Sequence, residues 1–300
     1  MASDTSPHKP EGRDKGAFSI DAETQLYGVF GDPVRHSLSP HLHNTLFRQR
    51  GLNAVYLAFT VDRDMLGLAF EAIRTLGMRG ANLTIPLKEE ALNHIDEIPE
   101  DIDRCIGALN TVVNRDGLLY GYNTDVPGFL AALKDELGFD PSGKKTLVVG
   151  AGGAARAAAF ALAHAGADTV HLTNRTKDRA SGLAEHLVEY FPETDIEAAA
   201  AEVFTGESFD LVVNATSCGM KSGEPSPFDL ASLKKAGAAY DLIYKPARTP
   251  FLDSAEKLKI PAANGLGMLA AQAALSFALW TGQTEGVRQA MQESLKKWSS

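Results

Sequence analysis

Short apolar runs alternate with amphipathic stretches along most of the chain, and this alternation predicts a series of strands and helices. We expect strands at Leu26–Phe30, Ala54–Val61, Gly80–Ile85, Thr111–Asn114, Leu118–Tyr122, Lys145–Val149, Thr169–Thr173, Leu211–Asn214 and Ala238–Ile243. We expect helices at His41–Gln49, Asp64–Thr75, Asp125–Leu137, Ala154–Ala165 and from Gly265 onward. Strands that alternate with helices are typical of an α/β fold with mostly parallel sheets.

Two features refine this picture. Asp116–Gly117 is a pair that favours tight hairpin turns, so the strands on either side of it are expected to form a hairpin. Residues 138–144 form a break rich in Gly and Pro, and the chain of 300 residues is long enough for two domains of ~100–200 residues each. The apolar run Leu266–Trp280 contains Gln272 and is shorter than the ~18–20 residues that span a bilayer. We interpret it as a buried helix and expect no membrane partner.

Composition and charge narrow the functional classes. The chain is 44% hydrophobic and 22% charged, as globular proteins are, and its net charge of -9 argues against a nucleic-acid partner. Its two cysteines, Cys105 and Cys218, give neither a disulfide framework nor the spacing of a metal site. We therefore expect no metal and a cytoplasmic location. Residues 1–22 lack the apolar segment of a signal peptide and are expected to be a flexible tail.

A glycine-rich segment follows the predicted strand Lys145–Val149 and precedes a predicted helix. It reads G-x-G-x-x-G/A, with Ala155 in the third position, and consists of Gly150, Ala151, Gly152, Gly153 and Ala154 before that alanine. Such glycines permit a tight turn and let the backbone approach a pyrophosphate at the helix N-terminus. Because strand, turn and helix come in the required order, we favour a dinucleotide site over an ordinary strand-to-helix turn.

The end of the next strand indicates which dinucleotide binds. NAD-binding folds carry a carboxylate there, about 20 residues after the glycines, to hold the ribose 2′-hydroxyl. This chain has Asn174 instead, followed by Arg175, Thr176 and, within the next helix start, Arg179. Guanidinium groups suit a 2′-phosphate through paired, charge-assisted hydrogen bonds, so we predict NADP as the cofactor. The alternative is a solvated helix start with scattered charges.

Polar residues also gather at predicted turns in the first 125 residues. Ser37 and Ser39 would share one side of an extended segment, although serines before a helix are more often caps. Pro86 is suited to open a helix, which would put Lys88 about one turn after Thr84. A single lysine is usually a solvated surface charge. Further clusters are Gly107–Thr111 and Asn123–Asp125, where Asp125 could equally cap a helix.

Together these clusters resemble the shikimate dehydrogenase family. The matching stretches are Gly31–Pro40, Gly80–Glu90, Gly107–Thr111, Asn123–Asp125, Gly150–Arg156, Asn174–Thr176, Asn214–Ser217, Tyr240–Tyr244 and Asn264–Gln272. The resemblance runs from about Tyr27 to the C-terminus. It implies an N-terminal α/β substrate-binding domain, residues 23–125, that is completed by C-terminal helices in residues 264–300. A Rossmann NADP-binding domain, residues 126–263, would be inserted between them.

The resemblance also implies a role for each matching residue. Ser37, Ser39 and Tyr244 would bind a substrate carboxylate, and the ring hydroxyls would be bound by Thr84, Asn110, Asp125 and Gln272. Lys88 would transfer the proton and Asp125 would pair with it. On the cofactor side, Gly150–Ala154 would hold the pyrophosphate, and the 2′-phosphate would be bound by Asn174, Arg175, Thr176 and Arg179. Leu242 and Gly265 would lie near the nicotinamide.

The implied activity is the reversible, NADP-dependent reduction of 3-dehydroshikimate to shikimate in chorismate and aromatic amino acid biosynthesis. In that direction a charged Lys88 would donate its proton to the new alkoxide. One alternative is a quinate/shikimate dehydrogenase with broader substrate or NAD use. Another, from a different class, is a non-catalytic binding module that responds to NADP. In each case the partner is a small molecule, and the chain is expected to be a monomer or homodimer.

Overall fold

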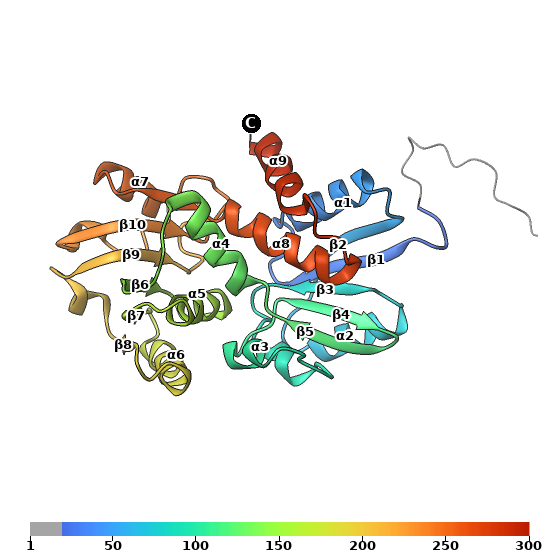
Figure 1. Ribbon diagram of the computed structural model, residues 1–300, viewed down its shortest axis with the longest axis horizontal. Helices are drawn as coiled ribbons and strands as arrows, with labels where there is room; N and C mark the ends of the chain where they lie inside the picture. Colours follow the sequence, from blue (N-terminus) through green and yellow to red (C-terminus); the bar gives the residue numbers. More distant parts are fainter. Residues whose placement is uncertain (1–19, 300) are drawn as a thin grey trace, which may run out of the picture.

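The computed structural model describes residues 20–299, so residues 1–19 of the predicted tail lie outside the described part. Two β-sheets lie side by side, and helices α4 (Asp125–Leu137) and α8 (Leu266–Thr281) lie between them (Figure 1). The two long helices pack against each other along much of their length. The predicted α/β class is thereby confirmed, with one sheet in each lobe.

The first sheet contains the strands β1 (Gln25–Gly31), β2 (Ala54–Thr60), β3 (Gly80–Leu83), β4 (Thr111–Arg115) and β5 (Leu118–Tyr122), in the order β2-β1-β3-β4-β5. The first three strands are parallel, and β4 is antiparallel to both of its neighbours. The predicted hairpin is confirmed, since Asp116 and Gly117 both have positive φ angles, 53° and 91°. The antiparallel pairing is thus confined to the strands around the predicted hairpin, and the rest of the sheet is parallel as expected.

Helices cover both faces of the first sheet. Apolar side chains of α1 (Ser39–Gln49), α8 and α9 (Val287–Ser299) form one core with β1 and β2. On the other face, α2 (Leu66–Thr75) and the segment that includes the 3-10 turn η1 (Glu90–Asn93) pack on β1, β3, β4 and β5. The C-terminal helices thus pack back on the N-terminal sheet, which is the arrangement that the family resemblance implied.

The second sheet is fully parallel and has the order β11-β10-β9-β6-β7-β8. Its strands are β6 (Lys145–Val149), β7 (Thr169–Thr173), β8 (Asp195–Ala198), β9 (Ser208–Asn214), β10 (Lys235–Asp241) and β11 (Ala262–Asn264). The chain leaves β6 toward β7 on one side and returns to β9 on the other. A crevice beyond the carboxyl ends of β6 and β9 is where such sheets bind ligands.

Helices cover the second sheet as well. One face packs on α4, α5 (Gly153–His164) and α6 (Lys177–Tyr190), and the short α3 (Asp101–Ile106) lies beside α5. The other face packs on α7 (Pro250–Lys257) and the 3-10 turns η2 (Ala201–Phe204) and η3 (Leu230–Ser232). Helix α5 contributes buried alanines, whose small side chains let it lie close to β6.

The contact between α4 and α8 links the lobes. A Cβ built on Gly128 of α4 would lie 2.9 Å from the Cβ of Gln272, so the two helices cross with almost no space between them. This crossing fixes Gln272 near the start of α4, where Asp125 lies. The domain boundaries expected at residues 125 and 264 fall at the start of α4 and the end of β11, and their placement stays a prediction.

Candidate active site between the two lobes

Lys88 and Asp125 form a buried ion pair at one edge of the first sheet. The Lys88 Nζ lies 2.6 Å from Asp125 Oδ2, and the two side chains are only 14% and 5% exposed. Asn110 Nδ2 donates to the other carboxylate oxygen of Asp125 over 3.0 Å. The carboxylate is thus held on both oxygens, and the lysine side chain is the more exposed of the two.

The fold brings these three residues together because strand ends meet at this edge. Lys88 follows the end of β3, Asn110 directly precedes β4, and Asp125 comes just after β5. Backbone bonds lock the segments: Leu109 N–H donates to the Lys88 carbonyl over 2.8 Å. Asn123 Oδ1 accepts the N–H groups of Asp125 and Val126 at 2.9 and 3.1 Å, and so caps α4. Asp125 therefore does not cap the helix, which was the alternative role that the sequence allowed for it.

A network of buried amide and hydroxyl groups lies beneath the pair and was not foreseen from the sequence. Asn82 Nδ2 donates to Thr111 Oγ1 and to Ser276 Oγ over 3.1 and 3.0 Å. Ser276 Oγ lies 2.8 Å from Thr111 Oγ1 and 3.2 Å from Thr124 Oγ1. Tyr56 completes it by donating to Asn82 Oδ1 over 2.7 Å. The network ties α8 to β3 and β4 and holds the floor of the site rigid.

Gln272, for which the family resemblance implied a contact with the ring hydroxyls, lies at the same edge. Its Oε1 lies 3.4 Å from Asn110 Nδ2, and its Nε2 donates to the Leu269 carbonyl of its own helix over 3.0 Å. Ser276, one turn later on α8, belongs to the floor network and is the polar residue that sequence reasoning missed. The signal was present, because Ser276 also interrupts the apolar run.

Ser37, Ser39 and Tyr244 lie together at the start of α1, although not in the predicted conformation. Burial raises the pKa of Tyr244, and hydrogen bonds with the Leu38 backbone and the Ser37 side chain partly offset that rise. Ser39 is buried and hydrogen-bonds Tyr56. The expected extended segment is wrong, because Ser39 is already the first residue of α1 and its N–H donates to Ser37 Oγ over 3.2 Å.

Thr84 follows β3 and packs beside the end of β1. A Cβ built on Gly31 would overlap the Thr84 side chain, which explains the small residue at that point. The helix expected to open at Pro86 is wrong. The Thr84 carbonyl accepts the Leu87 N–H over 2.8 Å, which closes a tight turn, and the first helical turn begins only at Glu90. Lys88 therefore projects from a loop rather than from a helix.

The glycine loop faces Lys88 across the boundary between the lobes. Gly150 has a φ of 126°, and a Cβ there would lie 2.9 Å from the Ala215 carbonyl oxygen, so only glycine suits the turn. A Cβ on Gly152 would point into open space, and α5 begins at Gly153 without a side-chain cap. Backbone without side chains and an uncapped helix N-terminus can accommodate a pyrophosphate, so the residues of this loop fit a bound dinucleotide.

The remaining predicted cofactor residues lie at the carboxyl ends of the strands. Asn174 Nδ2 donates to the Thr176 carbonyl over 2.9 Å at the end of β7, and Arg175 is exposed beside it. Arg179 projects from the first turn of α6, and its Nη2 lies 3.5 Å from Glu89 Oε1 of the other lobe. That contact was not predicted, because no sequence pattern relates residues that lie in two different lobes.

Leu242 and Gly265 are direct neighbours after β10 and β11. Gly265 N–H donates to the Ile243 carbonyl over 3.2 Å, and a Cβ on Gly265 would overlap the Leu242 carbonyl. The segment is anchored by buried Asp241, whose Oδ1 accepts from Asn214 Nδ2 over 2.9 Å and from the Ile243 N–H over 3.0 Å. Burial raises the pKa of Asp241 to about 6, with its hydrogen bonds acting in the opposite direction.

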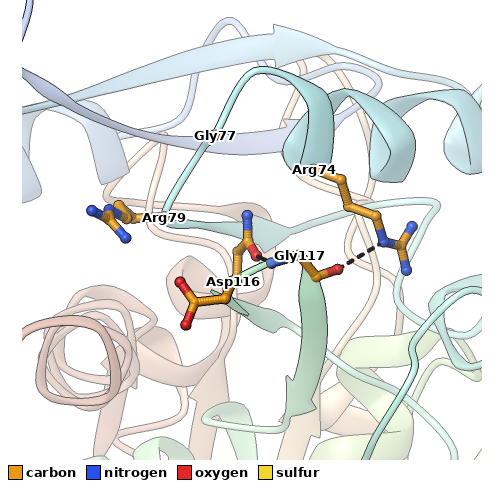
Figure 2. A pocket seen from close by; sticks show the side chains of 6 residues that line it. Arg74, Gly77, Arg79, Asp116 and Gly117 are labelled. Atoms are coloured by element: carbon orange, nitrogen blue, oxygen red, sulfur yellow. Dashed lines mark hydrogen bonds between the residues drawn. The ribbon is translucent and has the colours of Figure 1, made fainter.

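A cavity of about 410 Å³ lies at the opposite end of the first sheet and takes no part in this site (Figure 2). It is lined by Arg74, Gly77, Arg79, Asn114, Asp116 and Gly117. Strand β3 runs away from it, toward Thr84 and Lys88. Arg74 Nε donates to the Gly117 carbonyl over 3.1 Å, and its Nη2 lies 2.7 Å from Asp96, so this guanidinium is already partnered.

Comparison with known proteins identifies the family. The model of the "Shikimate dehydrogenase substrate binding domain" matches residues 29–112, that of "Shikimate / quinate 5-dehydrogenase" matches residues 132–220, and that of the "Shikimate 5'-dehydrogenase C-terminal domain" matches residues 265–296. The chain belongs to the shikimate dehydrogenase family. The resemblance drawn from the sequence motifs is thereby confirmed.

Individual relatives agree with this assignment over nearly the whole chain. The shikimate dehydrogenase (NADP(+)) of Caldanaerobacter subterraneus is 44% identical over 268 residues, which cover 89% of this chain and 95% of the relative. The shikimate dehydrogenase structure from Aquifex aeolicus has a TM-score of 0.82 at 40% identity, and covers 93% of this chain and 100% of its own. A Thermus thermophilus structure in complex with NADP(H) and shikimate has a TM-score of 0.80 at 39% identity, with 91% and 99% covered.

Two further findings concern the described residues alone. Between residues 20 and 299, none of the helices combines the length and the apolar character needed to cross a membrane. In the same part of the chain, no group of three or more His, Cys, Asp or Glu side chains is arranged to hold a metal ion.

Proposed function

We propose that this chain is an NADP-dependent shikimate dehydrogenase that reversibly reduces 3-dehydroshikimate to shikimate, a step of chorismate and aromatic amino acid biosynthesis. One observation carries the proposal: the buried pair of Lys88 and Asp125 faces the glycine loop at Gly153. An acid/base group and a nucleotide cradle thus lie next to each other, which is what the redox chemistry of a secondary alcohol requires. The family and the printed activities of its members support the same conclusion.

The proposed chemistry assigns Lys88 to proton transfer. In the reduction, its ammonium donates a proton to the oxygen of the new alcohol, and in the oxidation the same nitrogen accepts it. Asp125 holds the ammonium at 2.6 Å and would orient it, while Asn110 fixes the second carboxylate oxygen. NADP, when bound, supplies or accepts the hydride. The buried floor network supports this geometry by preventing the three side chains from shifting.

The other assignments concern substrate binding. Ser37, Ser39 and Tyr244 carry hydroxyl groups that would hold the carboxylate of the substrate, and their shared position at the start of α1 supports this. Thr84, Asn110, Asp125 and Gln272 would bind the ring hydroxyls. Asn110 already contacts Asp125 and Gln272, so these three polar groups converge on one side of the crevice.

The cofactor assignments follow the second sheet. Gly150–Ala154 would hold the pyrophosphate at the N-terminus of α5, and Leu242 with Gly265 would lie beside the nicotinamide. A 2′-phosphate would be bound by Asn174, Arg175, Thr176 and Arg179. The exposed guanidinium of Arg175 at the end of β7 supports NADP, because two nearby arginines suit a phosphate dianion better than a hydroxyl.

An absorbance assay tests this function. Purified protein should form NADPH from shikimate and NADP, and it should be much less active with quinate or with NAD. Equal activity with quinate or NAD would favour the broader quinate/shikimate dehydrogenase. Binding of NADP without turnover of either acid would instead indicate the non-catalytic module. We also infer a cytoplasmic monomer or homodimer, which fractionation and sedimentation analysis would check.

A further inference from the structure

Glu89 follows the proton-transfer lysine directly, yet its side chain reaches the other lobe. Its Oε1 lies 3.5 Å from Arg179 Nη2 on α6. Arg156, in the first turns of α5, belongs to the same group of charges. Burial lowers the pKa of Arg156, the Glu89 carboxylate raises it, and the neighbouring Arg179 lowers it again. One carboxylate of the substrate lobe therefore faces two guanidinium groups of the cofactor lobe.

Arg179 is also a residue that we assign to the 2′-phosphate. The carboxylate is therefore close to the place where a phosphate dianion would bind. Both groups prefer the same cation, and they repel each other. Each side chain of the ion pair is open to water, since Arg179 is 50% and Glu89 36% exposed. Pairs of this kind shift an equilibrium by less than about fivefold, so a ligand is able to displace the carboxylate.

We propose that Glu89 determines how strongly this chain prefers 2′-phosphorylated nucleotides, by holding Arg179 from across the crevice. The proposal rests on the proposed function, because it requires that Arg179 serve the 2′-phosphate of NADP. When the phosphate binds, Arg179 must then either break its ion pair with Glu89 or divide its hydrogen-bond donors between Glu89 and the phosphate. Nucleotides without the 2′-phosphate leave the ion pair undisturbed. Glu89 thus weakens the binding of NADP but not that of NAD, and it reduces the difference in affinity between the two cofactors.

A simpler role for the same ion pair is to hold the two lobes together. The two roles differ in what Glu89→Gln does. If the pair only joined the lobes, its loss would change the binding of every nucleotide that occupies the crevice, and in the same direction. If Glu89 competes with the phosphate, the change is confined to ligands that carry it. Fragments of the cofactor separate these effects, because they need no chemistry at Lys88.

Calorimetric titration of the full chain with adenosine 2′,5′-bisphosphate and with adenosine 5′-monophosphate tests the proposal. Glu89→Gln should bind the bisphosphate about two- to fivefold more tightly than the unmodified protein does, and the monophosphate equally well. The gain should shrink as salt is raised from about 50 mM to about 1 M, since the interaction is between exposed charges. The matched control is Glu90→Gln. The Glu90 carboxylate faces His94 rather than Arg179, so its removal should bring no gain.

The outcome in an Arg179→Gln background completes the test. There the second change, Glu89→Gln, should bring a clearly smaller gain than it does in the unmodified protein, because the cation for which carboxylate and phosphate compete is gone and only their direct repulsion remains. Unchanged or weaker bisphosphate binding by Glu89→Gln would overturn the proposal, as would an equal gain for the monophosphate. Glu89→Ala, which lacks the amide, checks that the gain does not arise from a new hydrogen bond. A failure of the bisphosphate to bind even the unmodified protein would instead refute the proposed cofactor.

Discussion

Gly153 leaves the space in which the side chain of Lys88 lies against the cofactor lobe: a Cβ built on Gly153 would lie 3.0 Å from the Cβ of Lys88 and 3.3 Å from its Cδ. The helix that begins at Gly153 cannot move away easily, because it is packed on β6 by buried alanines. The position of the acid/base group therefore depends on the presence of a glycine, without a side chain, at position 153 of the other lobe.

Gly153→Ala should lower kcat by about two- to tenfold, because the Lys88 side chain would have to shift by a few tenths of an ångström, less than the ~1 Å displacement of a catalytic group that costs about a hundredfold. Steady-state kinetics with shikimate and NADP measures it. Gly182→Ala is the control: it lies on α6, an added Cβ there meets no atom within 4 Å, and activity should be unchanged. Wild-type kcat in Gly153→Ala would mean that the Lys88 side chain is free to shift without consequence.

Lys88→Ala should lower kcat by about a hundred- to ten-thousandfold and leave the KM for shikimate nearly unchanged, as expected for the loss of a general acid/base. The measurement is the same assay at saturating NADP. Lys134→Ala removes an exposed lysine from α4 and should have no effect. A Lys88→Ala enzyme within about threefold of normal kcat would exclude the proton-transfer role.

Replacement of both Arg175 and Arg179 by Gln should weaken NADP binding far more than NAD binding, because only NADP carries the 2′-phosphate that the guanidinium groups would pair with. Fluorescence titration of each cofactor gives the two dissociation constants. Lys177→Gln, which removes one exposed positive charge at the start of α6, is the control for a general loss of positive charge in this segment. Equal losses for the two cofactors would remove the argument for a phosphate site at the end of β7.

Sequence patterns were sufficient where local chemistry dictates the structure. The glycine segment at Gly150 and the hairpin turn at Asp116 form as predicted, because a turn with positive φ leaves few alternatives. The short elements α3, β8, α7 and β11 were not predicted, and no range was predicted for α6. Strand β8 carries alternating charged residues at the edge of its sheet, so its strand character comes from pairing with β7 rather than from its own composition.

The polar site was predictable only in part. Lys88, Asn110 and Asp125 come together as the family resemblance implied, but the resemblance did not supply the floor beneath them. Ser276 contributes to that floor by its hydrogen bond with Thr111, although the two residues are 165 positions apart in sequence, so no local pattern connects them. The ion pair of Glu89 is of the same kind, since it depends on how two lobes face each other. Long-range polar contacts of this sort require coordinates.

Asp103 offers a test of how burial of a carboxyl group affects stability. It lies on α3, is 6% exposed, and accepts a hydrogen bond from the backbone N–H of Asn123, beside the cap of α4. Burial raises its pKa to about 6, the hydrogen bond lowers it, and the nearby Glu100 raises it further. The usual value is 3.8, so between about pH 4 and pH 6 the folded protein binds more protons at this site than the unfolded chain does.

This difference makes the contribution of Asp103 to stability greatest below about pH 4 and causes it to fall as the pH rises through about 6. Asp103→Asn keeps the acceptor oxygen for Asn123 and removes the titration. Its stability relative to the unmodified protein should therefore rise by about 2 kcal/mol between about pH 4 and pH 7, which is less than the full pKa shift corresponds to because the unfolded chain is already partly ionised at pH 4. Urea unfolding at both pH values measures it, with Gly182→Ala as a control that changes no titratable group. A relative stability of Asp103→Asn that is the same at both pH values, or that falls with pH, would contradict the assignment.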